Sequence, residues 1–289
     1  MHRDEFEISE SLVRRLLREQ FPRWADLTLR RIEPGGTVNL IFRLGDELSL
    51  RIPRRDGPTE PGGKEFEWLP KLAPLVPLKV PVPVAQGHPT DEYPWFWDVY
   101  TWADGDDEPV ESIDAIQAAR DLAAFVAALQ RADPNGAPAG RGIPLAERDK
   151  DIRHWLARFD GDPRVAAEWE RAVAAPAWEG PPVWTHGDLD ARNWLVEGGR
   201  ISAIIDWGVM GAGDPACDVM VAWKLHSAAA RDAFRESLPT DDATWDRARG
   251  WVLSQAIAAL AYYTPENNPA LYREAESWLQ LVLSERDGR

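Results

Sequence analysis

The apolar pattern of the sequence changes abruptly at the acidic stretch 103–109, and this change constrains the fold more than any other feature. Before it, residues 38–52 form two short apolar segments around a glycine-containing turn, which is typical of an antiparallel β-meander. After it, residues 113–131 are rich in alanine and repeat their apolar positions with a helical period. The sequence therefore predicts an α+β chain with two lobes, a small antiparallel β N-terminal lobe over residues 1–102 and a larger, mostly helical C-terminal lobe over residues 103–289.

Shorter patterns predict further elements in both lobes. Residues 95–102 favour a strand that leads to the lobe boundary, and residues 194–205 favour a β-hairpin inside the helical lobe. The segment 80–84 alternates valine with proline, and because proline cannot donate to a β-ladder, this segment is excluded from the centre of a sheet. Three more segments have a helical or strongly apolar pattern: 9–21, 64–73 and 251–263.

The charge balance narrows the class of partner. Lysine and arginine total 33 against 48 aspartate and glutamate, which gives a net charge of −15. A surface of this sign repels the phosphates of nucleic acids and anionic lipids, so we expect no nucleic acid and no membrane as a partner. Small cationic molecules fit this charge better.

Cysteine usage and the N-terminus indicate the compartment. Cys217 is the only cysteine, which excludes an intrachain disulfide and a cysteine-based metal site and favours a buried structural thiol. The N-terminus is charged, and no apolar run reaches the roughly 18 residues that a membrane span needs. We therefore expect a cytoplasmic protein.

The most informative segment runs from His186 to Asn193 and is followed, after the hairpin, by Asp206. An aspartate and an asparagine five positions apart on one loop can face a common centre, where Asp188 accepts a hydroxyl proton and Asn193 offers a neutral oxygen to Mg²⁺. Asp206 adds a metal-binding carboxylate at the end of the returning strand. Phosphoryl transfer needs this division of roles, because the acceptor must be held in line while a divalent metal offsets the charge of the phosphate oxygens.

The order His-x-Asp-x-x-x-x-Asn, followed by Asp-x-Gly, is also that of the protein-kinase catalytic loop and its metal element. With glycine between His186 and Asp188, and with Gly213–Asp218 downstream, the sequence resembles the aminoglycoside phosphotransferase family, which are small-molecule relatives of the protein kinases. The resemblance covers nearly the whole chain. It implies a two-lobed protein-kinase-like fold and an ATP-dependent transferase of the antibiotic-resistance type.

Carried over residue by residue, the resemblance assigns roles in the helical lobe. Asp188 is the catalytic base, and His186 orders the catalytic loop. Asn193 and Asp206 are the Mg²⁺ ligands, and Asp218 supports the loop. These five side chains are the predicted catalytic centre.

The resemblance also implies a nucleotide site in the first lobe. A cation is expected on the third strand, where this sequence has Arg51 in place of the usual lysine, and Glu65 is its expected partner, with Glu67 as the alternative. Main-chain groups of the strand before the boundary would contact adenine, which assigns Val99 and Thr101. Backbone N–H groups of a hairpin would cover the phosphates. The residues predicted for this hairpin are Gly35, Gly36, Thr37 and Asn39.

Besides Arg51, two further departures from the family distinguish this chain. Many relatives carry His-Pro-Gly where this sequence has Asp190-Ala191-Arg192, which places an extra charge pair beside the base. Trp207 stands where relatives often have phenylalanine, a change of size within an aromatic packing role.

Acidic residues expected near the acceptor form the predicted substrate rim: Asp106, Asp107 and Asp190.

The acceptor and the donor nucleotide remain open at this point. The leading interpretation is phosphorylation of a hydroxyl on a small cationic molecule by ATP, with GTP as an alternative donor and an aminoglycoside as the acceptor that the resemblance implies. Choline, amino-sugar, fructosamine-like and macrolide kinases share the same core. The alternative from another class is a nucleotide-binding pseudokinase, which Arg51 favours and the intact Asp188, Asn193 and Asp206 oppose. The sequence does not determine the oligomeric state.

Overall fold

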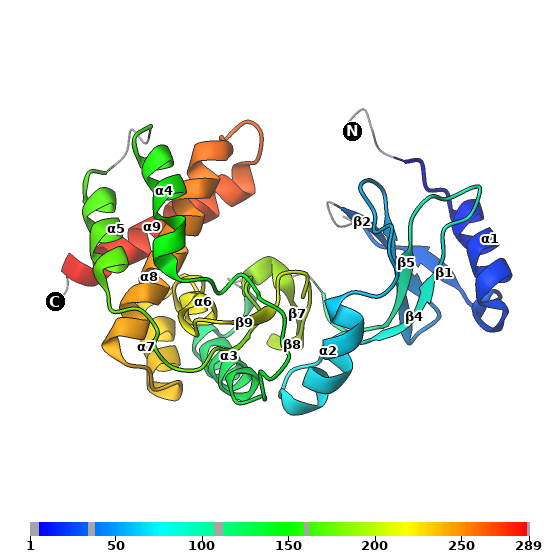
Figure 1. Cartoon of the computed structure of the whole chain (residues 1–289), viewed down its shortest axis with the longest axis horizontal. Coiled ribbons are helices and arrows are strands. Elements are labelled where there is room, and N and C mark those ends of the chain that lie inside the picture. Colours follow the sequence, from blue (N-terminus) through cyan, green and yellow to red (C-terminus); the bar gives the residue numbers. More distant parts are fainter. Residues whose placement is uncertain (1–5, 34–37, 107–111, 159–161, 288–289) are drawn as a thin grey trace. The chain divides into compact units, whose positions relative to one another are not determined.

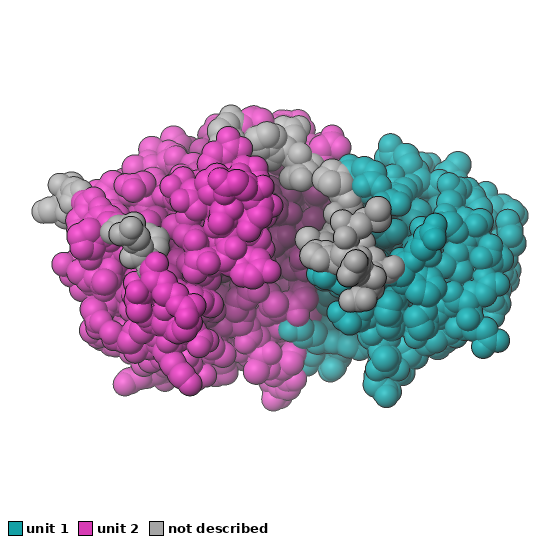
Figure 2. Space-filling view, turned by 90° about the horizontal axis from the view of Figure 1, so that it is seen from above, with its two compact units in different colours: residues 1–74, 79–104 teal, residues 75–78, 105–289 magenta. Residues whose placement is uncertain are grey.

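A computed structural model of the chain divides it into two compact units. The structure describes residues 6–33, 38–106, 112–158 and 162–287. Unit 1 comprises residues 1–74 and 79–104, and unit 2 comprises residues 75–78 and 105–289 (Figure 2). The sequence predicts a boundary after residue 102, and unit 1 extends two residues further, to Asp104.

Unit 1 is built on an antiparallel sheet (Figure 1), and the order of its five strands is β1-β2-β3-β5-β4. Its strands are β1 (Leu29–Arg31), β2 (Asn39–Leu44), β3 (Leu48–Pro53), β4 (Pro83–Gly87) and β5 (Trp97–Thr101), and its helices are α1 (Glu10–Gln20) and α2 (Lys64–Leu72). The predicted meander is present, because β2 pairs with β3 from Asn39 opposite Pro53 to Leu44 opposite Leu48. Pro83 begins an edge strand, which agrees with the exclusion of this proline-rich segment from the centre of a sheet.

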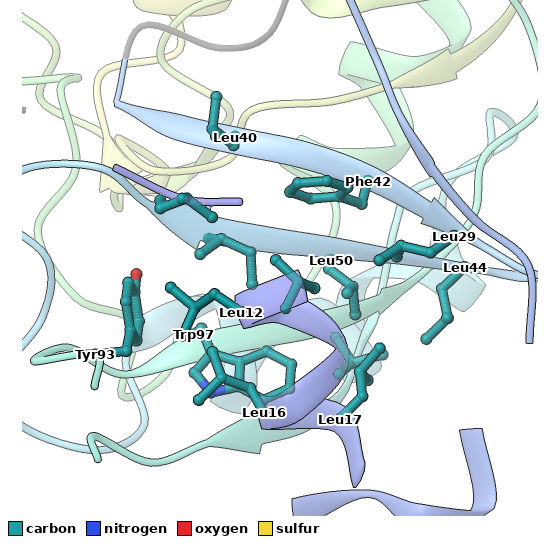
Figure 3. Packing of buried hydrophobic residues seen from close by; sticks show 14 residues of the cluster. Leu12, Leu16, Leu17, Leu29, Leu40, Phe42, Leu44, Leu50, Tyr93 and Trp97 are labelled. Atoms are coloured by element: carbon teal, nitrogen blue, oxygen red, sulfur yellow. The ribbon is translucent and has the colours of Figure 1, made fainter. Parts of the chain in front are cut away.

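The core of unit 1 lies between α1 and the sheet, as Figure 3 shows. Ser9 caps α1 by accepting a hydrogen bond from the Leu12 N–H at 3.2 Å. The apolar stripe of α1 is buried and consists of Leu12, Val13, Leu16 and Leu17. It packs with Phe42, Leu50 and Trp97 of the sheet, and each fully buried side chain of this size contributes about 1.5–3 kcal/mol. This packing fixes β3, the strand that carries Arg51.

Unit 2 is mostly helical. Its helices are α3 (Ala115–Gln130), α4 (Asp149–Leu156), α5 (Arg164–Ala174), α6 (Ala216–Val219), α7 (Ala228–Ser237), α8 (Asp242–Tyr262) and α9 (Pro269–Asp287). α8 packs against α4, α5, α6 and α9. Because Trp251, Val252 and Leu253 point in different directions around α8 and are all fully buried, the helix is enclosed here on every side. The interior position predicted for residues 251–263 therefore holds for the first turns, whereas Tyr262 in the last turn is 75% exposed. Across the described residues, no helix combines the length and the apolar character that a membrane span requires.

Two short strand pairs interrupt the helices of unit 2. β7 (Trp194–Glu197) and β8 (Arg200–Ile204) form the predicted hairpin. β6 (Val183–Thr185) pairs with β9 (Gly211–Gly213), with Thr185 opposite Gly211. The sequence does not predict β9, because Gly-Ala-Gly has little strand propensity and becomes a strand only through this pairing. Together, β6 and β7 hold the two ends of the segment 186–193.

Candidate active site

The first residues of the segment 186–193 are hydrogen-bonded to a buried carboxylate, that of Asp218. Asp218 in α6 accepts hydrogen bonds from the backbone N–H groups of His186 at 2.7 Å and of Gly187 at 2.8 Å. Burial raises the pKa of Asp218 to about 6, while the two N–H groups act in the opposite direction. This is the supporting contact that the family resemblance implies for Asp218.

Gly187 makes the turn that presents Asp188. Its φ is +86°, and a Cβ at this position would lie 3.0 Å from the Val209 carbonyl oxygen and 3.1 Å from the Cβ of Arg141. Both the left-handed conformation and the tight space require glycine. The side chains of His186 and Leu189 are buried, whereas the Asp188 side chain is 29% exposed. Asp188 is therefore the residue of this turn that offers its carboxylate to a ligand.

His186 joins the loop to the segment that follows β8. Its Nδ1 accepts a hydrogen bond from the Asp188 N–H at 3.2 Å, so in the neutral ring the proton lies on Nε2, which donates to the Ile205 carbonyl oxygen at 3.0 Å. The ring also packs edge-on against Trp207, with 4.7 Å between ring centres. Burial lowers the pKa of His186 to about 4, so the ring is neutral at pH 7 and cannot serve there as a charged acid. The geometry suits a loop-ordering residue.

This burial gives His186 a measurable effect on stability. An unfolded histidine has a pKa near 6.5, so the lowered folded value contributes stability above pH 6.5 that is lost as the pH falls toward 4. We expect the free energy of unfolding to fall between pH 6.5 and pH 4.5 by about 2 kcal/mol more in the parent than in His186→Gln. Urea unfolding at the two pH values measures the difference, with His154→Gln as the matched control because His154 is exposed on α4. An equal loss in parent and His186→Gln would contradict the expectation.

Asn193 closes the loop back onto Asp188. Its Nδ2 donates to the Asp188 backbone oxygen at 2.8 Å and lies 3.3 Å from Oδ2 of the same residue. Because the amide nitrogen is used in this way, the amide oxygen is the side-chain atom that can face a cation. The Asn193 carbonyl oxygen also accepts from the Ile205 N–H at 2.8 Å, which places Asp206 beside Asn193. The structure thus brings Asp188, Asn193 and Asp206 together within unit 2.

Asp206 has an exposed carboxylate and a left-handed backbone with φ of +60°. This conformation is uncommon outside glycine, and strained backbones of this kind concentrate at functional sites. Within the described ranges, no cluster of three or more His, Cys, Asp or Glu side chains could hold a metal ion by itself. Mg²⁺, however, takes only one or two protein carboxylates and completes its shell with water and substrate phosphates. A carboxylate from Asp206 and an amide oxygen from Asn193 fit that donor set.

Arg141 is a site residue that the sequence does not predict. Its guanidinium donates to Oδ1 of Asp188 and to the Gly187 carbonyl oxygen, the second contact measuring 3.4 Å. The available signal is the Gly-Arg-Gly run at 140–142 together with the Gly-Ala-Gly run at 211–213, since glycines allow two backbones to approach closely. Neither run indicates chemistry until the fold brings them together.

Asp190 requires a correction, because it does not lie on an exposed substrate rim. Its carboxylate accepts from Arg192 Nε at 2.8 Å and from Lys224 Nζ at 3.2 Å, and the Asp190 and Lys224 side chains are each 1% exposed. Burial alone would raise the pKa of Asp190, but Lys224 and Arg192 together hold it well below its usual range. Lys224 Nζ also donates a hydrogen bond to Gln255 Oε1 on α8 at 2.5 Å. The carboxylate is thus enclosed in a charge network that ties the catalytic loop to α8, and it does not face an acceptor.

Of the other two residues predicted for the rim, the structure describes Asp106 but not Asp107. Asp106 is exposed, and its backbone exchanges two hydrogen bonds of 2.9 Å with Val196 in β7. Asp107 lies outside the described residues. An acidic rim therefore stays a prediction, with Asp106 as its described member.

Unit 1 holds Arg51 in a defined geometry. Nη1 of Arg51 donates to Oε2 of Glu65 at 3.0 Å, and the guanidinium carbon lies 4.1 Å from the centre of the Tyr100 ring. The Tyr100 hydroxyl donates to the same Glu65 oxygen at 3.0 Å. Glu67 instead pairs with Lys71 at 3.3 Å. The structure thus brings together Arg51 and Glu65, the first choice of the two predicted pairs.

The strand expected to contact adenine is β5. The Val99 side chain is fully buried in the core of unit 1. The Thr101 N–H donates to the Val82 carbonyl oxygen at 2.9 Å, and the Thr101 hydroxyl accepts from the Val82 N–H at 2.9 Å. Because the Thr101 N–H already donates to Val82, a main-chain contact from Thr101 to a base would have to come from the Thr101 carbonyl oxygen. Asn39 begins β2, half-buried, whereas Gly35, Gly36 and Thr37 lie outside the described residues.

The chain matches a family model described as the phosphotransferase enzyme family over residues 28–251. No curated protein matches the chain. Similar folds occur among solved structures. The GDP complex of aminoglycoside 2′-phosphotransferase-IIIa has a TM-score of 0.70 and 15% identity, and the match covers 97% of this chain and 99% of that one.

Two further solved structures have the same fold. Macrolide 2′-phosphotransferase MphH from Brachybacterium faecium, solved as the apoenzyme, has a TM-score of 0.62 and 24% identity, with 92% of this chain and 98% of that chain covered. A thermostable mutant of aminoglycoside phosphotransferase APH(4)-Ia, in a ternary complex with AMP-PNP and hygromycin B, has a TM-score of 0.62 and 20% identity, with 94% and 98% covered. The predicted protein-kinase-like fold class is confirmed.

Proposed function

The chain belongs to the phosphotransferase enzyme family, and from this premise we propose that it transfers the γ-phosphate of ATP to a hydroxyl group of a small cationic molecule of the aminoglycoside class. The observation that carries the proposal is the loop 186–193, which brings Asp188 and Asn193 together with Asp206. The donor could equally be GTP, since solved relatives hold GDP, ADP and AMP-PNP. The acceptor hydroxyl is the reacting group in either case.

Asp188 acts on the acceptor in the proposed reaction. The hydroxyl oxygen attacks the γ-phosphorus, the bond from phosphorus to the bridging oxygen of the leaving nucleoside diphosphate breaks, and the hydroxyl proton passes to the Asp188 carboxylate. Asn193 and Asp206 would hold Mg²⁺, which when bound offsets the charge on the phosphate oxygens. His186 and Asp218 act through the backbone, because their contacts fix the turn that presents Asp188.

Arg51 supplies the phosphate-binding cation in this proposal. We expect Arg51→Ala to raise the KM for ATP about tenfold or more with a smaller change in kcat, because a charge-assisted contact to the phosphates is lost. Arg51→Lys should keep much of the affinity, since it retains the charge. Initial rates at varied ATP measure both effects, and Arg31→Ala is the control because Arg31 makes an exposed ion pair with Glu33. If Arg51→Ala has the KM of the parent protein, the phosphates are bound elsewhere.

The charge of the acceptor follows from the acidity of the chain. The net charge is −15, and Asp106 is an exposed acidic residue among those predicted for the rim. An acidic surface concentrates cations, and this attraction is screened over about 8 Å at physiological ionic strength. A polycationic acceptor should therefore show a KM that rises with salt at nearly constant kcat, and Asp106→Asn should reduce that rise.

A panel of acceptors tests the proposal. Kanamycin, gentamicin and hygromycin B represent polycations, and erythromycin represents a macrolide with a single amine. Acceptor-dependent formation of ADP or GDP with the polycations, and with a salt-dependent KM, is the expected result. Turnover with erythromycin alone, or a KM that stays flat with salt, would contradict the polycationic aminoglycoside class while leaving a kinase. Nucleotide turnover that no acceptor stimulates would contradict phosphorylation of these acceptor classes.

A further inference from the structure

Arg141 contacts Asp188, the predicted catalytic base, and this contact can determine how the Asp188 carboxylate is oriented toward the acceptor. The guanidinium donates to Oδ1 of Asp188 and, at 3.4 Å, to the carbonyl oxygen of Gly187, the residue just before it. Resting on that function, we propose that Arg141 is a positioning residue, which holds the Asp188 carboxylate in the orientation that receives the acceptor proton. Nothing in the motif 186–193 encodes this arginine, because it comes from a separate segment of unit 2.

The carboxylate of Asp188 is held from two sides. Arg141 binds Oδ1, and Nδ2 of Asn193 lies 3.3 Å from Oδ2. The second contact is long, and the same Nδ2 makes a shorter bond of 2.8 Å to the Asp188 backbone oxygen. The orientation of the carboxylate plane therefore depends mainly on Arg141. Each carboxylate oxygen can accept more than one hydrogen bond, so the guanidinium does not exclude an acceptor hydroxyl.

The backbone of Arg141 is itself fixed against the active-site strands. The Arg141 N–H donates to the Val209 carbonyl oxygen at 3.0 Å. On either side of this bond, the Ala212 N–H donates to Pro138 at 2.8 Å and the Asp214 N–H donates to Gly142 at 2.8 Å. The segment 138–142 therefore lies along β9, whose partner β6 leads directly into His186.

Glycines on both segments allow an approach too close for any side chain. A Cβ on Gly140 would lie 2.6 Å from the Gly211 nitrogen, and a Cβ on Gly213 would lie 2.2 Å from the Gly142 carbonyl oxygen. Real Cβ atoms do not approach backbone atoms at such distances, so the two backbones are packed directly on one another. This packing sets the place of Arg141 relative to the catalytic loop and leaves it little freedom to shift.

The exposure of the pair separates a functional role from a structural one. The Arg141 and Asp188 side chains are 33% and 29% exposed, so the pair is open to a ligand. An ion pair with this much solvent contact contributes little to stability, and Arg141→Ala should therefore fold. A loss of turnover without a loss of fold is then attributable to the orientation of Asp188.

The test uses the full chain with nucleotide, Mg²⁺ and whichever acceptor of the panel (kanamycin, gentamicin, hygromycin B or erythromycin) the parent protein phosphorylates fastest. We expect Arg141→Ala to lower kcat about 10- to 100-fold with the KM for nucleotide within about twofold, because a small misplacement of a catalytic group can cost a factor of this size. Arg141→Lys should retain a larger share of kcat, and added methylguanidine should restore part of the activity of Arg141→Ala. Methylguanidine should have no such effect on Asp188→Ala, which lacks the group to be positioned. Arg153→Ala is the matched control, because Arg153 pairs with Asp149 and Glu170 on an exposed face of unit 2.

The outcomes separate this proposal from the proposed function. If the parent protein phosphorylates none of the four acceptors, the proposed function fails. If the parent protein is active and Asp188→Ala is not, but Arg141→Ala has an unchanged or higher kcat, the positioning role alone is overturned. It is also overturned if Arg141→Ala raises only the KM for nucleotide, or if neither lysine nor methylguanidine restores any activity, because the arginine would then bind substrate or serve only the fold.

Discussion

We expect Asp188→Ala to lower kcat by about 10²–10⁴-fold and to leave the KM for nucleotide nearly unchanged, because in the proposed reaction the carboxylate acts on the acceptor proton and not on the nucleotide. The Asp188 side chain is one of the more exposed groups of its turn, and its removal leaves the Asp218 and His186 contacts to the backbone in place. The variant should therefore fold. Initial-rate kinetics with the best acceptor, together with nucleotide binding measured by calorimetry, separate the two effects.

Asp188→Asn sharpens this expectation. Asparagine has nearly the shape of aspartate but accepts a proton poorly, so kcat should fall almost as far as in Asp188→Ala. Asp232→Ala is the control, since the carboxylate of Asp232 is 70% exposed on α7. Near-parental turnover in both Asp188 variants would remove the assignment of the base.

The second large effect is expected at the predicted metal ligands. Asp206→Gly should raise the Mg²⁺ concentration that gives half-maximal activity by about tenfold or more, because one of the few protein ligands of the ion is lost. Glycine is the substitution of choice, since φ at Asp206 is +60° and alanine would add backbone strain to the loss of the ligand. Asn193→Ala should act in the same direction, and it should also lower kcat because the hydrogen bond to Asp188 is lost.

A titration of activity with Mg²⁺ at saturating nucleotide measures this effect. Asp206→Asn should lie between the parent protein and Asp206→Gly, since asparagine keeps a neutral oxygen and tolerates the left-handed conformation. Glu236→Ala is the control, because Glu236 is an exposed acidic residue on α7. An Mg²⁺ dependence that is unchanged in Asp206→Gly and in Asn193→Ala would show that the ion binds elsewhere.

Local spacing is sufficient to predict the centre of this site. Asp188 and Asn193 lie five positions apart on one loop, and the β7–β8 hairpin returns the chain to Asp206, so the three residues are brought together by elements that the sequence pattern itself predicts. The Arg51–Glu65 pair is predicted by the family resemblance, and the structure shows the hydrogen bond between this strand and the helix that follows it. In these places the structure depends on short-range chain geometry.

Tertiary packing determines what the sequence does not predict. β9 is a strand only because β6 lies beside it, and Arg141 reaches Asp188 only because glycines let residues 138–142 pack on β9. The acidic side chain of Asp190 likewise does not indicate by itself whether the residue is exposed or buried. Asp190 is buried because its charge is paired with Lys224, which comes from a distant part of the chain and lies 3.2 Å away.

The most direct test of hydroxyl phosphorylation is to follow the γ-phosphate itself. The full chain is incubated with ATP or GTP, Mg²⁺ and kanamycin, gentamicin, hygromycin B or erythromycin in turn, and ³¹P NMR records where the phosphate goes, with Asp188→Asn in parallel. For at least one acceptor we expect a phosphomonoester resonance that grows in step with the nucleoside diphosphate and stays near the baseline in Asp188→Asn. Diphosphate formed with inorganic phosphate alone, or a phosphomonoester that Asp188→Asn makes as fast as the parent protein, would contradict a kinase that uses this loop.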